Sequence, residues 1–311
     1  MLPKILPVPG RMGIAAAVGL LAGCGAQPAP SSAAHHPTIV SLNPCTDAIL
    51  AEVTAPGQLL AITHYSHDPR ATSMPLAEAR RYRATGGTVE EVLALDPDIV
   101  VASSYLDPAA ANAFRRLGIR VEAVGIAATV AQSEAQVRRL AALAGEPARG
   151  QALVARIDHA VAAAHRSGEG VTALVWQEGG LVPGPDTLVA QLLHNSGFAS
   201  LSAARGLGQG AYLPLEQVLA DPPRLVIAAG DERMEHHPAL RHVKGVRYAA
   251  IAPNLLFCGG PTIPRLAARL TELRDGMGRP LPAAGGVWGG TDHRSLTDPP
   301  PAPSAGGRGV S

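Results

Sequence analysis

A stretch of 13 residues occurs twice in this chain. Residues 90–102 align without a gap on residues 216–228, and seven positions are identical. Each copy predicts a short helix that opens on a glutamate, breaks near a proline and is followed by an apolar strand typical of a buried parallel sheet. The long separation favours two similar lobes over a solenoid, whose repeats follow one another every ~20–50 residues.

The patterns around the two copies predict the same kind of lobe twice. Further strands are expected at residues 38–42, 58–63, 119–124, 171–176 and 246–252, and further helices at residues 45–53, 108–117, 186–195 and 262–277. Strands that alternate with helices indicate a parallel α/β sheet. We therefore expect an α/β fold with an N-terminal lobe at residues 38–144, a C-terminal lobe at residues 169–278 and a ligand cleft between them.

A helical linker is expected at residues 145–168. Two helical patterns, at residues 130–143 and 148–166, are separated by Gly145, Glu146 and Pro147. A single long helix between two lobes is a stiff connection. If this helix packs along both lobes, hinge closure will be small.

The first 24 residues have the pattern of an export signal. Lys4 and Arg11 precede an apolar stretch at residues 14–22, which is shorter than the ~20 residues of a membrane span. Residues 21–24 resemble the lipobox of bacterial lipoproteins, in which the cysteine, here Cys24, becomes the acylated first residue. The alternative is a plain signal peptide with an incidental cysteine. A flexible tether at residues 25–37 and a disordered tail at residues 279–311 are expected from their Pro, Gly, Ala and Ser content.

Charge and motifs exclude several classes of protein. Lys and Arg number 26 against 25 Asp and Glu, so no basic face for nucleic acid is expected. The nucleophile-elbow, phosphate-loop and zinc-protease motifs are missing from the sequence, and its glycine pairs lack a dinucleotide-binding context. We expect no enzyme. The alternatives are a thiol-dependent enzyme that uses the cleft, or a transition-metal-binding lipoprotein.

Aromatic residues mark the expected ligand cleft. The chain has only ten of them, and five lie where strands end or helices begin: Tyr65, Tyr105, Trp176, Tyr212 and Phe257. The carboxyl ends of the strands in open α/β sheets face the ligand crevice, where rings offer stacking area to a large flat ligand. Ordinary packing at strand ends is the alternative for each single ring.

Polar side chains near the same strand ends are further candidate ligand contacts. They are His64 and Arg70 in the segment after the second strand, and Arg81 and Arg233, for which a solvated loop is the alternative. His64 and His67 are too few for a transition-metal site, which needs three or four ligands, so we expect no metal site.

Cys45 and Cys258 remain open to three interpretations. After removal of Cys24 they are the only cysteines, one in each lobe beside a predicted helix start. Two buried thiols are the favoured interpretation. A disulfide across the cleft and direct contact with the ligand are the alternatives.

The order of these features resembles the periplasmic binding proteins for ferric siderophores, haem and vitamin B12. The lipobox, the opening strand and Asn43-Pro44, the repeated Glu-x-Val-Leu-Ala pattern and the bridging helix carry the resemblance. It implies a protein without a cofactor of its own that delivers a cobalt corrinoid such as cobalamin, or a ferric chelate, to an ABC importer. The partners would be a permease dimer with its ATPase, and the location would be the periplasm, with a lipid anchor.

In the resembling family, a glutamate at each of two equivalent helix starts docks on arginines of the permease. The resemblance therefore assigns permease docking to Glu90 and Glu216. The family's usual Pro-Ser-x-Thr-Glu after the first strand reads Pro44-Cys45-Thr46-Asp47 here, one residue shorter. This departure weakens any transfer of ligand contacts from that loop.

Overall fold

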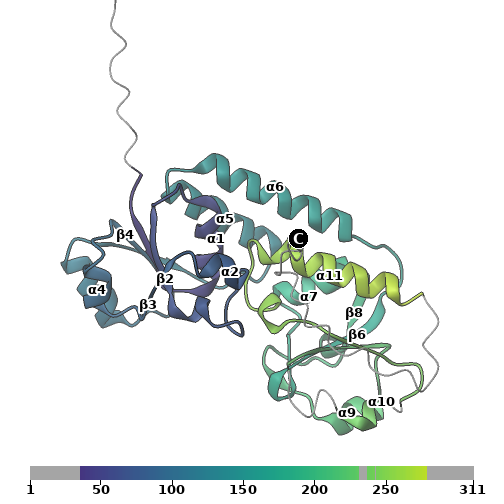
Figure 1. Ribbon diagram of the computed structural model, residues 1–311. Coiled ribbons are helices and arrows are strands. Elements are labelled where there is room, and N and C mark those ends of the chain that lie inside the picture. Colours follow the sequence, from purple (N-terminus) through teal and green to yellow (C-terminus); the bar gives the residue numbers. More distant parts are fainter. Residues whose placement is uncertain (1–35, 231–236, 242, 279–311) are drawn as a thin grey trace, which may run out of the picture. The chain divides into compact units, whose positions relative to one another are not determined.

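The N-terminal lobe is built on sheet A, whose five strands are all parallel. The structure, a computed structural model, describes residues 36–230, 237–241 and 243–278 (Figure 1). The strand order of sheet A is β3-β2-β1-β4-β5. The strands are β1 (Ile39–Ser41), β2 (Leu59–Thr63), β3 (Arg83–Thr85), β4 (Ile99–Ser103) and β5 (Arg120–Val124).

The helices of this lobe cover both faces of sheet A. They are α1 (Pro44–Val53), η1 (His64–His67), α2 (Leu76–Ala79), α3 (Val89–Leu93), α4 (Pro108–Arg116) and α5 (Val130–Leu143). Alternate residues of the strands serve the two faces, since Ile99 and Val101 pack in the central core with α1 and α5, whereas Val100 packs in an outer core with α3 and α4. The lobe is therefore a three-layered unit built on the parallel α/β sheet that the sequence predicts.

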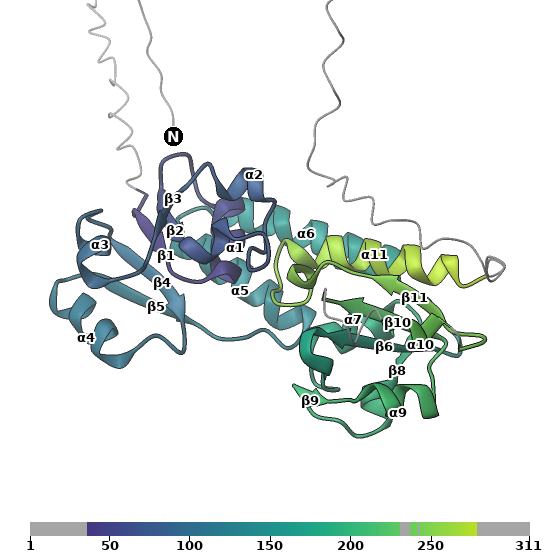
Figure 2. The same cartoon turned by 60° about the horizontal axis from the view of Figure 1, so that its bottom comes forward.

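The C-terminal lobe is built on sheet B, with the strand order β11-β10-β6-β7-β9 and β8 also paired with β6. Its strands are β6 (Val171–Gln177), β7 (Leu181–Val182), β8 (Phe198–Ser200), β9 (Ala211–Tyr212), β10 (Leu225–Ala229) and β11 (Arg247–Ala250). Its helices are η2 (Glu178–Gly180), α7 (Leu188–Asn195), α8 (Leu201–Ala204), α9 (Leu215–Ala220), α10 (Pro238–Arg241), η3 (Pro253–Leu255) and α11 (Thr262–Gly276). Figure 2 shows β6, β10 and β11 side by side.

Sheet B differs from the expected parallel sheet at one edge. Strand β7 pairs antiparallel with both β6 and β9. Gly179 and Gly180 reverse the chain between β6 and β7 with φ angles of 74° and 76°, a conformation that favours glycine. Strands of two residues carry no readable period, which is why the sequence pattern did not predict this ribbon.

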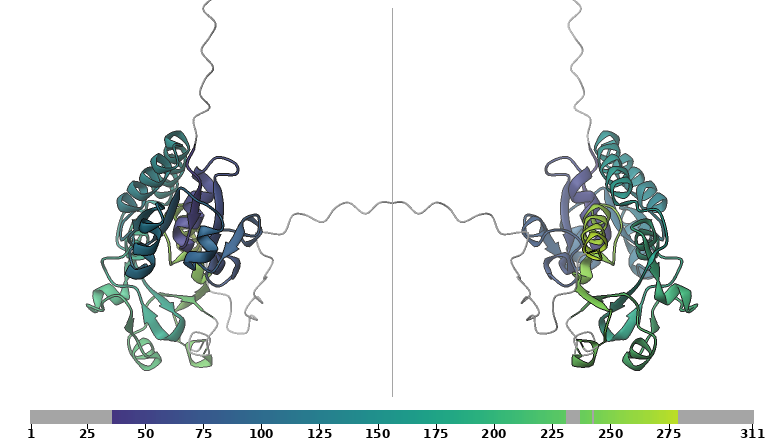
Figure 3. Two further views of the ribbon diagram at one scale, coloured as in Figure 1. Left: turned by 90° about the vertical axis from the view of Figure 1, so that its left-hand side faces the viewer. Right: turned by 90° about the vertical axis from the view of Figure 1, so that its right-hand side faces the viewer.

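The expected linker is helix α6 (Pro147–Ala164). It packs against α1 and α5 on the N-terminal side and against α7 and α11 on the C-terminal side. In the end-on views of Figure 3, the teal helices α5 and α6 lie along one side of the purple N-terminal sheet, and α11 is the yellow helix. Leu153, Val154 and Ile157 of α6 are buried in the central core. The helix therefore belongs to the packing of both lobes, as a stiff connection requires.

The repeat is confirmed as a repeated structural unit. Helix α3 and strand β4 correspond to α9 and β10, in the register of the sequence alignment. Val92 and Val100 lie in the outer core of the N-terminal lobe, and Val218 and Val226 lie in that of the C-terminal lobe. The two copies therefore use the same positions for the same packing.

Several predictions lie outside the described residues: the export signal with Cys24, most of the tether, Arg233 and the tail at residues 279–311. The last two tether residues are described and contact the N-terminal lobe. Gln58 Nε2 donates to Pro37 O at 2.9 Å, and His36 Nδ1 lies 3.3 Å from Ala144 O. Among the described residues, no helix is long and apolar enough to cross a membrane.

Candidate functional site

The carboxyl ends of the strands in the two sheets face each other, as an ion pair between the lobes shows. Arg70 follows β2 and η1, and Glu178 directly follows β6. Arg70 Nη2 donates to both carboxylate oxygens of Glu178 at 3.1 Å. Both side chains are more than half exposed, so the pair contributes little stability. Its value here is geometric, since it places the carboxyl ends of β2 and β6 opposite each other.

A disulfide also joins the two lobes. Cys45, in the first turn of α1, is bonded to Cys258, which precedes α11, with a Cα–Cα distance of 5.2 Å. The favoured prediction of two buried thiols is therefore wrong, and the disulfide alternative is confirmed. Sequence spacing alone did not decide between them, because the pairing depends on how close the two lobes come.

The glycines after Cys258 permit this close approach. A Cβ atom on Gly260 would lie 2.7 Å from Ile49 Cγ1 of α1. The Gly260 amide donates to Ser133 Oγ of α5 at 2.7 Å. A glycine pair without a dinucleotide-binding context thus has a packing role at the lobe junction.

The loop between η1 and α2 is also attached to the C-terminal lobe. Ser73 Oγ donates to Cys258 Sγ at 2.8 Å, and Arg265 Nη1 donates to Ser73 O at 3.3 Å. Together with the Arg70–Glu178 ion pair, these bonds hold one loop of the N-terminal lobe against the C-terminal lobe. We define this loop, residues 68–75, as the lobe-joining loop.

Four exposed rings lie beyond the carboxyl ends of strands. Tyr65 follows β2, Tyr105 follows β4, Tyr212 ends β9, and Phe257 follows β11 and η3. Between 51% and 79% of each side chain is exposed. Tyr212 lies at the same edge as the carboxyl end of β6, because Leu181 pairs with both Gln177 and Tyr212. Large exposed rings at the ligand-facing edges of both sheets offer apolar area that the fold itself does not use.

Trp176 does not belong to this group. Its side chain is fully buried in the outer core of the C-terminal lobe, and its Nε1 donates to Leu213 O at 3.0 Å. The prediction that Trp176 stacks on a ligand does not fit this position. Side chains alternate between the two faces of a strand, and Trp176 lies on the face that α9 covers.

Tyr65 lies in helix η1, and the other three residues of this helix each contact the N-terminal lobe. Ser66 is fully buried and its Oγ donates to Asp47 Oδ2 at 2.7 Å. His64 Nδ1 lies 3.3 Å from Thr85 O, and His67 Nε2 lies 3.1 Å from Ala79 O. The His64 ring also lies 4.1 Å from the Tyr65 ring, centroid to centroid. Both imidazoles thus have a partner within the N-terminal lobe, although His64 is exposed and remains a candidate ligand contact.

Asp47 is a buried carboxyl group beside this segment. Its Oδ2 accepts hydrogen bonds from the Thr63 amide and from Ser66 Oγ, and its Oδ1 has no hydrogen-bond partner among the described residues. Burial raises the pKa of Asp47 to about 8, against the opposing effect of these hydrogen bonds. The side chain is therefore largely protonated at neutral pH.

Arg81 lies away from the ligand-facing edge. It precedes the amino end of β3, and its Nη1 donates to Glu78 Oε2 at 2.8 Å. The amino ends of parallel strands lie at the edge opposite their carboxyl ends. The prediction that Arg81 contacts the ligand is not supported by this position.

Sequence reasoning named the guanidinium of Arg70 as a possible ligand contact but missed Glu178 and Asp47. Glu178 comes shortly after a predicted strand, a position that would have made it a candidate. Asp47 carried a weaker signal, since only the tertiary structure shows its burial.

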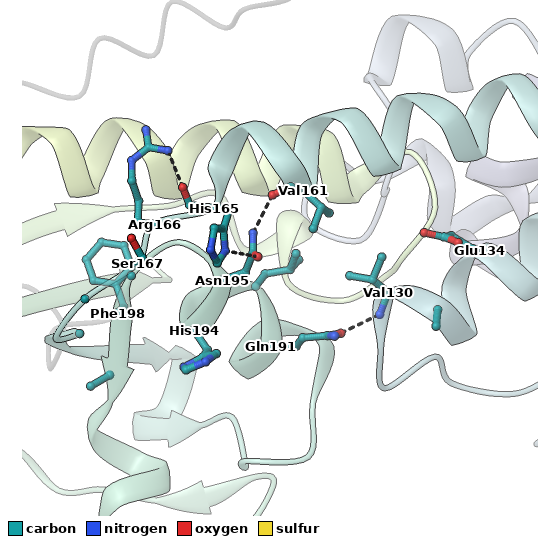
Figure 4. A pocket seen from close by; sticks show the side chains of 16 residues that line it. Val130, Glu134, Val161, His165, Arg166, Ser167, Gln191, His194, Asn195 and Phe198 are labelled. Atoms are coloured by element: carbon teal, nitrogen blue, oxygen red, sulfur yellow. Dashed lines mark hydrogen bonds between the residues drawn. The ribbon is translucent and has the colours of Figure 1, made fainter.

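A cavity of about 700 Å³ lies elsewhere, between α5, α6, α7 and β8. Figure 4 shows Gln191, His194 and Asn195 of α7 below Val161 of α6. Asn195 Nδ2 donates to Val161 O at 2.8 Å, and Gln191 Oε1 accepts from the Val130 amide at 2.7 Å. Gly170 and Gly197, at the amino ends of β6 and β8, also line it, so it does not coincide with the ligand-facing edge. None of the four exposed rings lines it.

The described residues contain no group of three or more His, Cys, Asp or Glu side chains placed to hold a metal ion.

Glu90 and Glu216 are both exposed, in the first turns of α3 and α9. They occupy equivalent positions of the two repeat copies. Both carboxylates are therefore accessible to a partner.

The sequence profile described as periplasmic binding protein matches residues 39–251. The chain belongs to this family. Membership of the periplasmic binding protein family implies a periplasmic location. Among curated proteins, none matches the sequence.

Solved structures share the fold of this periplasmic binding protein. The haem-binding protein RhuT from Roseiflexus sp. RS-1 is 19% identical, with 78% of this chain and 98% of that chain covered and a TM-score of 0.62. The haem-binding protein HutB of Vibrio cholerae is 19% identical, with 76% and 98% covered and a TM-score of 0.64. The vitamin B12 binding protein BtuF of Vibrio cholerae is 16% identical, with 79% and 99% covered and a TM-score of 0.60. At these identities the likeness concerns the fold.

Proposed function

We propose that this periplasmic binding protein captures a metal chelate, a cobalt corrinoid or a ferric chelate (siderophore or haem), and delivers it to an ABC importer. The observation that carries the proposal is the set of four exposed rings, Tyr65, Tyr105, Tyr212 and Phe257. They lie at the ligand-facing edges of both lobes, and the chain has only ten aromatic residues. Exposed rings of this kind supply stacking area and orientation to a flat ligand.

The names of the solved relatives support this class of ligand. RhuT and HutB are described as haem-binding, and BtuF as binding vitamin B12. Both ligands carry a metal in a large ring, and both have polar groups at the periphery. Arg70 and His64 are the candidate partners for such polar groups, since both are exposed in the segment that follows β2.

The disulfide removes the basis of the enzyme alternative. That alternative relied on Cys45 and Cys258 as thiols, and both sulfur atoms are bonded to each other. A disulfide sulfur is not a nucleophile, since the thiolate is the reactive form.

The proposal is tested by recording visible spectra of the purified protein with ferric haem, cobalamin and a ferric siderophore. One of them should bind with a spectral change and a saturable titration. Tyr65→Ala and Tyr105→Ala should each weaken this binding by about 1–3 kcal/mol, the range for losing a buried ring. Leu117→Ala is a matched control, because Leu117 is also exposed but lies beside the amino end of β5. Absence of binding to all three chelates would overturn the proposal.

We further propose that Glu90 and Glu216 dock on the permease and that Cys24 carries the lipid anchor. The equivalence of α3 and α9 supports the first role, since two similar acidic positions suit a partner with two-fold symmetry. The lipobox pattern at residues 21–24 supports the second role. An acyl mass on Cys24, lost in Cys24→Ala, tests the anchor by mass spectrometry.

A further inference from the structure

The Asp47 side chain has no role in the proposed capture of ligand, yet it lies beside the segment that carries Tyr65. It is fully buried at the start of α1, and its hydrogen-bond partners are neutral. A buried carboxyl group without a cationic partner costs stability, so its contacts with η1 call for an explanation.

Asp47 joins three elements of the N-terminal lobe. From α1, its Oδ2 accepts the Thr63 amide at 3.1 Å, where β2 ends, and Ser66 Oγ at 2.7 Å, within η1. One oxygen atom therefore holds both the start and the middle of the segment that leaves β2. Thr63 and Ser66 are themselves buried, so water does not compete for these bonds.

The position of Tyr65 depends on this segment. Helix η1 has only four residues, and a 3₁₀ turn of this length has little stability of its own. Ser66 is its one buried residue, whereas the neighbouring Tyr65 is 56% exposed. The buried side chain of Ser66 thus determines on which side of η1 the Tyr65 ring leaves the lobe.

We infer that Asp47 is a positioning residue of the ligand site: through Ser66 it holds η1 so that Tyr65 is presented to the ligand. The ligand part of this inference rests on the proposed function. The positioning part concerns the protein without ligand.

The positioning part is tested by hydrogen exchange of the amides of residues 64–68 in the ligand-free protein. Ser66→Ala removes the hydroxyl that donates a hydrogen bond to Asp47. Amide exchange in this segment should then accelerate by about 3- to 10-fold, as expected for one lost hydrogen bond. Ser66→Thr keeps a hydroxyl and should restore slow exchange. Asp47→Asn keeps an acceptor oxygen and should stay close to the wild type, whereas Asp47→Leu should not.

The ligand part is tested by titration with ferric haem, or with cobalamin if haem does not bind. Ser66→Ala should weaken binding by about 3- to 10-fold. In a Tyr65→Ala background the same change should have almost no further effect, because Ser66 acts through Tyr65. A general loss of stability would lower binding equally in both backgrounds.

Ser202→Ala is the matched control. Ser202 is also a buried serine whose hydroxyl donates one hydrogen bond, to Pro183 O at 2.8 Å, but it lies in the C-terminal lobe. Its removal should leave exchange at residues 64–68 unchanged. Unchanged exchange in both Ser66→Ala and Asp47→Leu would overturn the inference, whether or not the wild type binds a chelate. Binding of none of the three chelates (ferric haem, cobalamin or the ferric siderophore) by the wild type, with accelerated exchange in Ser66→Ala, would count against the proposed function alone.

Discussion

The outer cores of the two lobes share equivalent residues from the repeat but differ in their largest side chain. In each lobe, the repeat supplies one helix valine and one strand valine to an outer core, Val92 with Val100 and Val218 with Val226. The largest side chain of the N-terminal outer core is Phe114, from helix α4. In the C-terminal lobe it is Trp176, which comes from strand β6 itself.

The repeat therefore supplies less than half of the buried residues of each outer core. In the N-terminal lobe, helix α4 supplies the large ring of the outer core, that of Phe114. The C-terminal lobe adds Val182, Leu201 and Leu213 from the segment around β7 and β9, and this segment covers the Trp176 ring. The same segment places Tyr212 at the ligand-facing edge. A lobe-specific addition thus supplies both packing and a candidate ligand contact.

The largest expected effect tests the two outer cores. Trp176→Ala and Phe114→Ala each remove a fully buried ring, so each should lower the free energy of unfolding by about 3–5 kcal/mol. Denaturant unfolding measures both. A folded Trp176→Ala variant should retain chelate binding. If Trp176→Ala weakens binding but leaves stability unchanged, the assignment of this ring to the core is wrong.

The disulfide is the next largest effect, and it tests whether the lobes are held as one unit. Cys45→Ala with Cys258→Ala opens a link between residues 213 positions apart and should cost about 2–5 kcal/mol of stability. Reduction of the wild type should reproduce the loss. A reductant that also destabilises the double variant would show that the effect does not come from this disulfide.

Asp47 predicts a pH dependence that belongs to the N-terminal lobe. Burial raises its pKa from 3.8 to about 8. Between these values the folded protein keeps a proton that the unfolded chain has released, so stability falls as the pH rises through this window. From about pH 5 to about pH 8 the loss due to Asp47 should be about 3–4 kcal/mol.

Asp47→Asn should remove this part of the pH dependence. Urea unfolding of the wild type and the variant at each pH gives the difference, in which the contributions of all other groups cancel. Parallel curves for the two proteins would contradict a raised pKa of Asp47.

The smallest effect on the isolated protein is expected for the two repeat glutamates. Glu90→Ala with Glu216→Ala removes helix-start carboxylates worth about 0.3–1 kcal/mol each and leaves the ligand-facing edges intact. Chelate affinity should be unchanged. Uptake through the cognate importer should fall strongly, because charged contacts at the edge of an interface govern how two proteins orient and how fast they meet. Glu169→Ala, another exposed glutamate outside both copies, is the control. Normal uptake by the double variant at wild-type abundance would refute the docking role.

Much of the fold was predictable because its elements carry local signals. The predicted strand at residues 119–124 corresponds to β5, and the helical pattern at residues 130–143 coincides with α5. Pro108 and Pro147 mark helix starts, since proline suits the first turn. Two-residue strands such as β7 carry too few residues for any period.

The site was less predictable, because a strand end specifies an edge of a sheet but not the direction of a side chain. Tyr105 and Trp176 were equal candidates by position. Trp176 still belongs to β6, and its side chain lies on the face that α9 covers, whereas Tyr105 lies in the turn beyond β4 and is exposed.

The two-lobed α/β plan, the linking helix and the candidate rings could be read from the sequence, because they follow from periodicity, breakers and composition within short windows. The Cys45–Cys258 disulfide, the Arg70–Glu178 ion pair and the burial of Asp47 beneath η1 could be seen only in the folded chain. Each of these depends on the distance between segments far apart in the chain. Such distances are set by the packing of both lobes on α6, and no local pattern contains them.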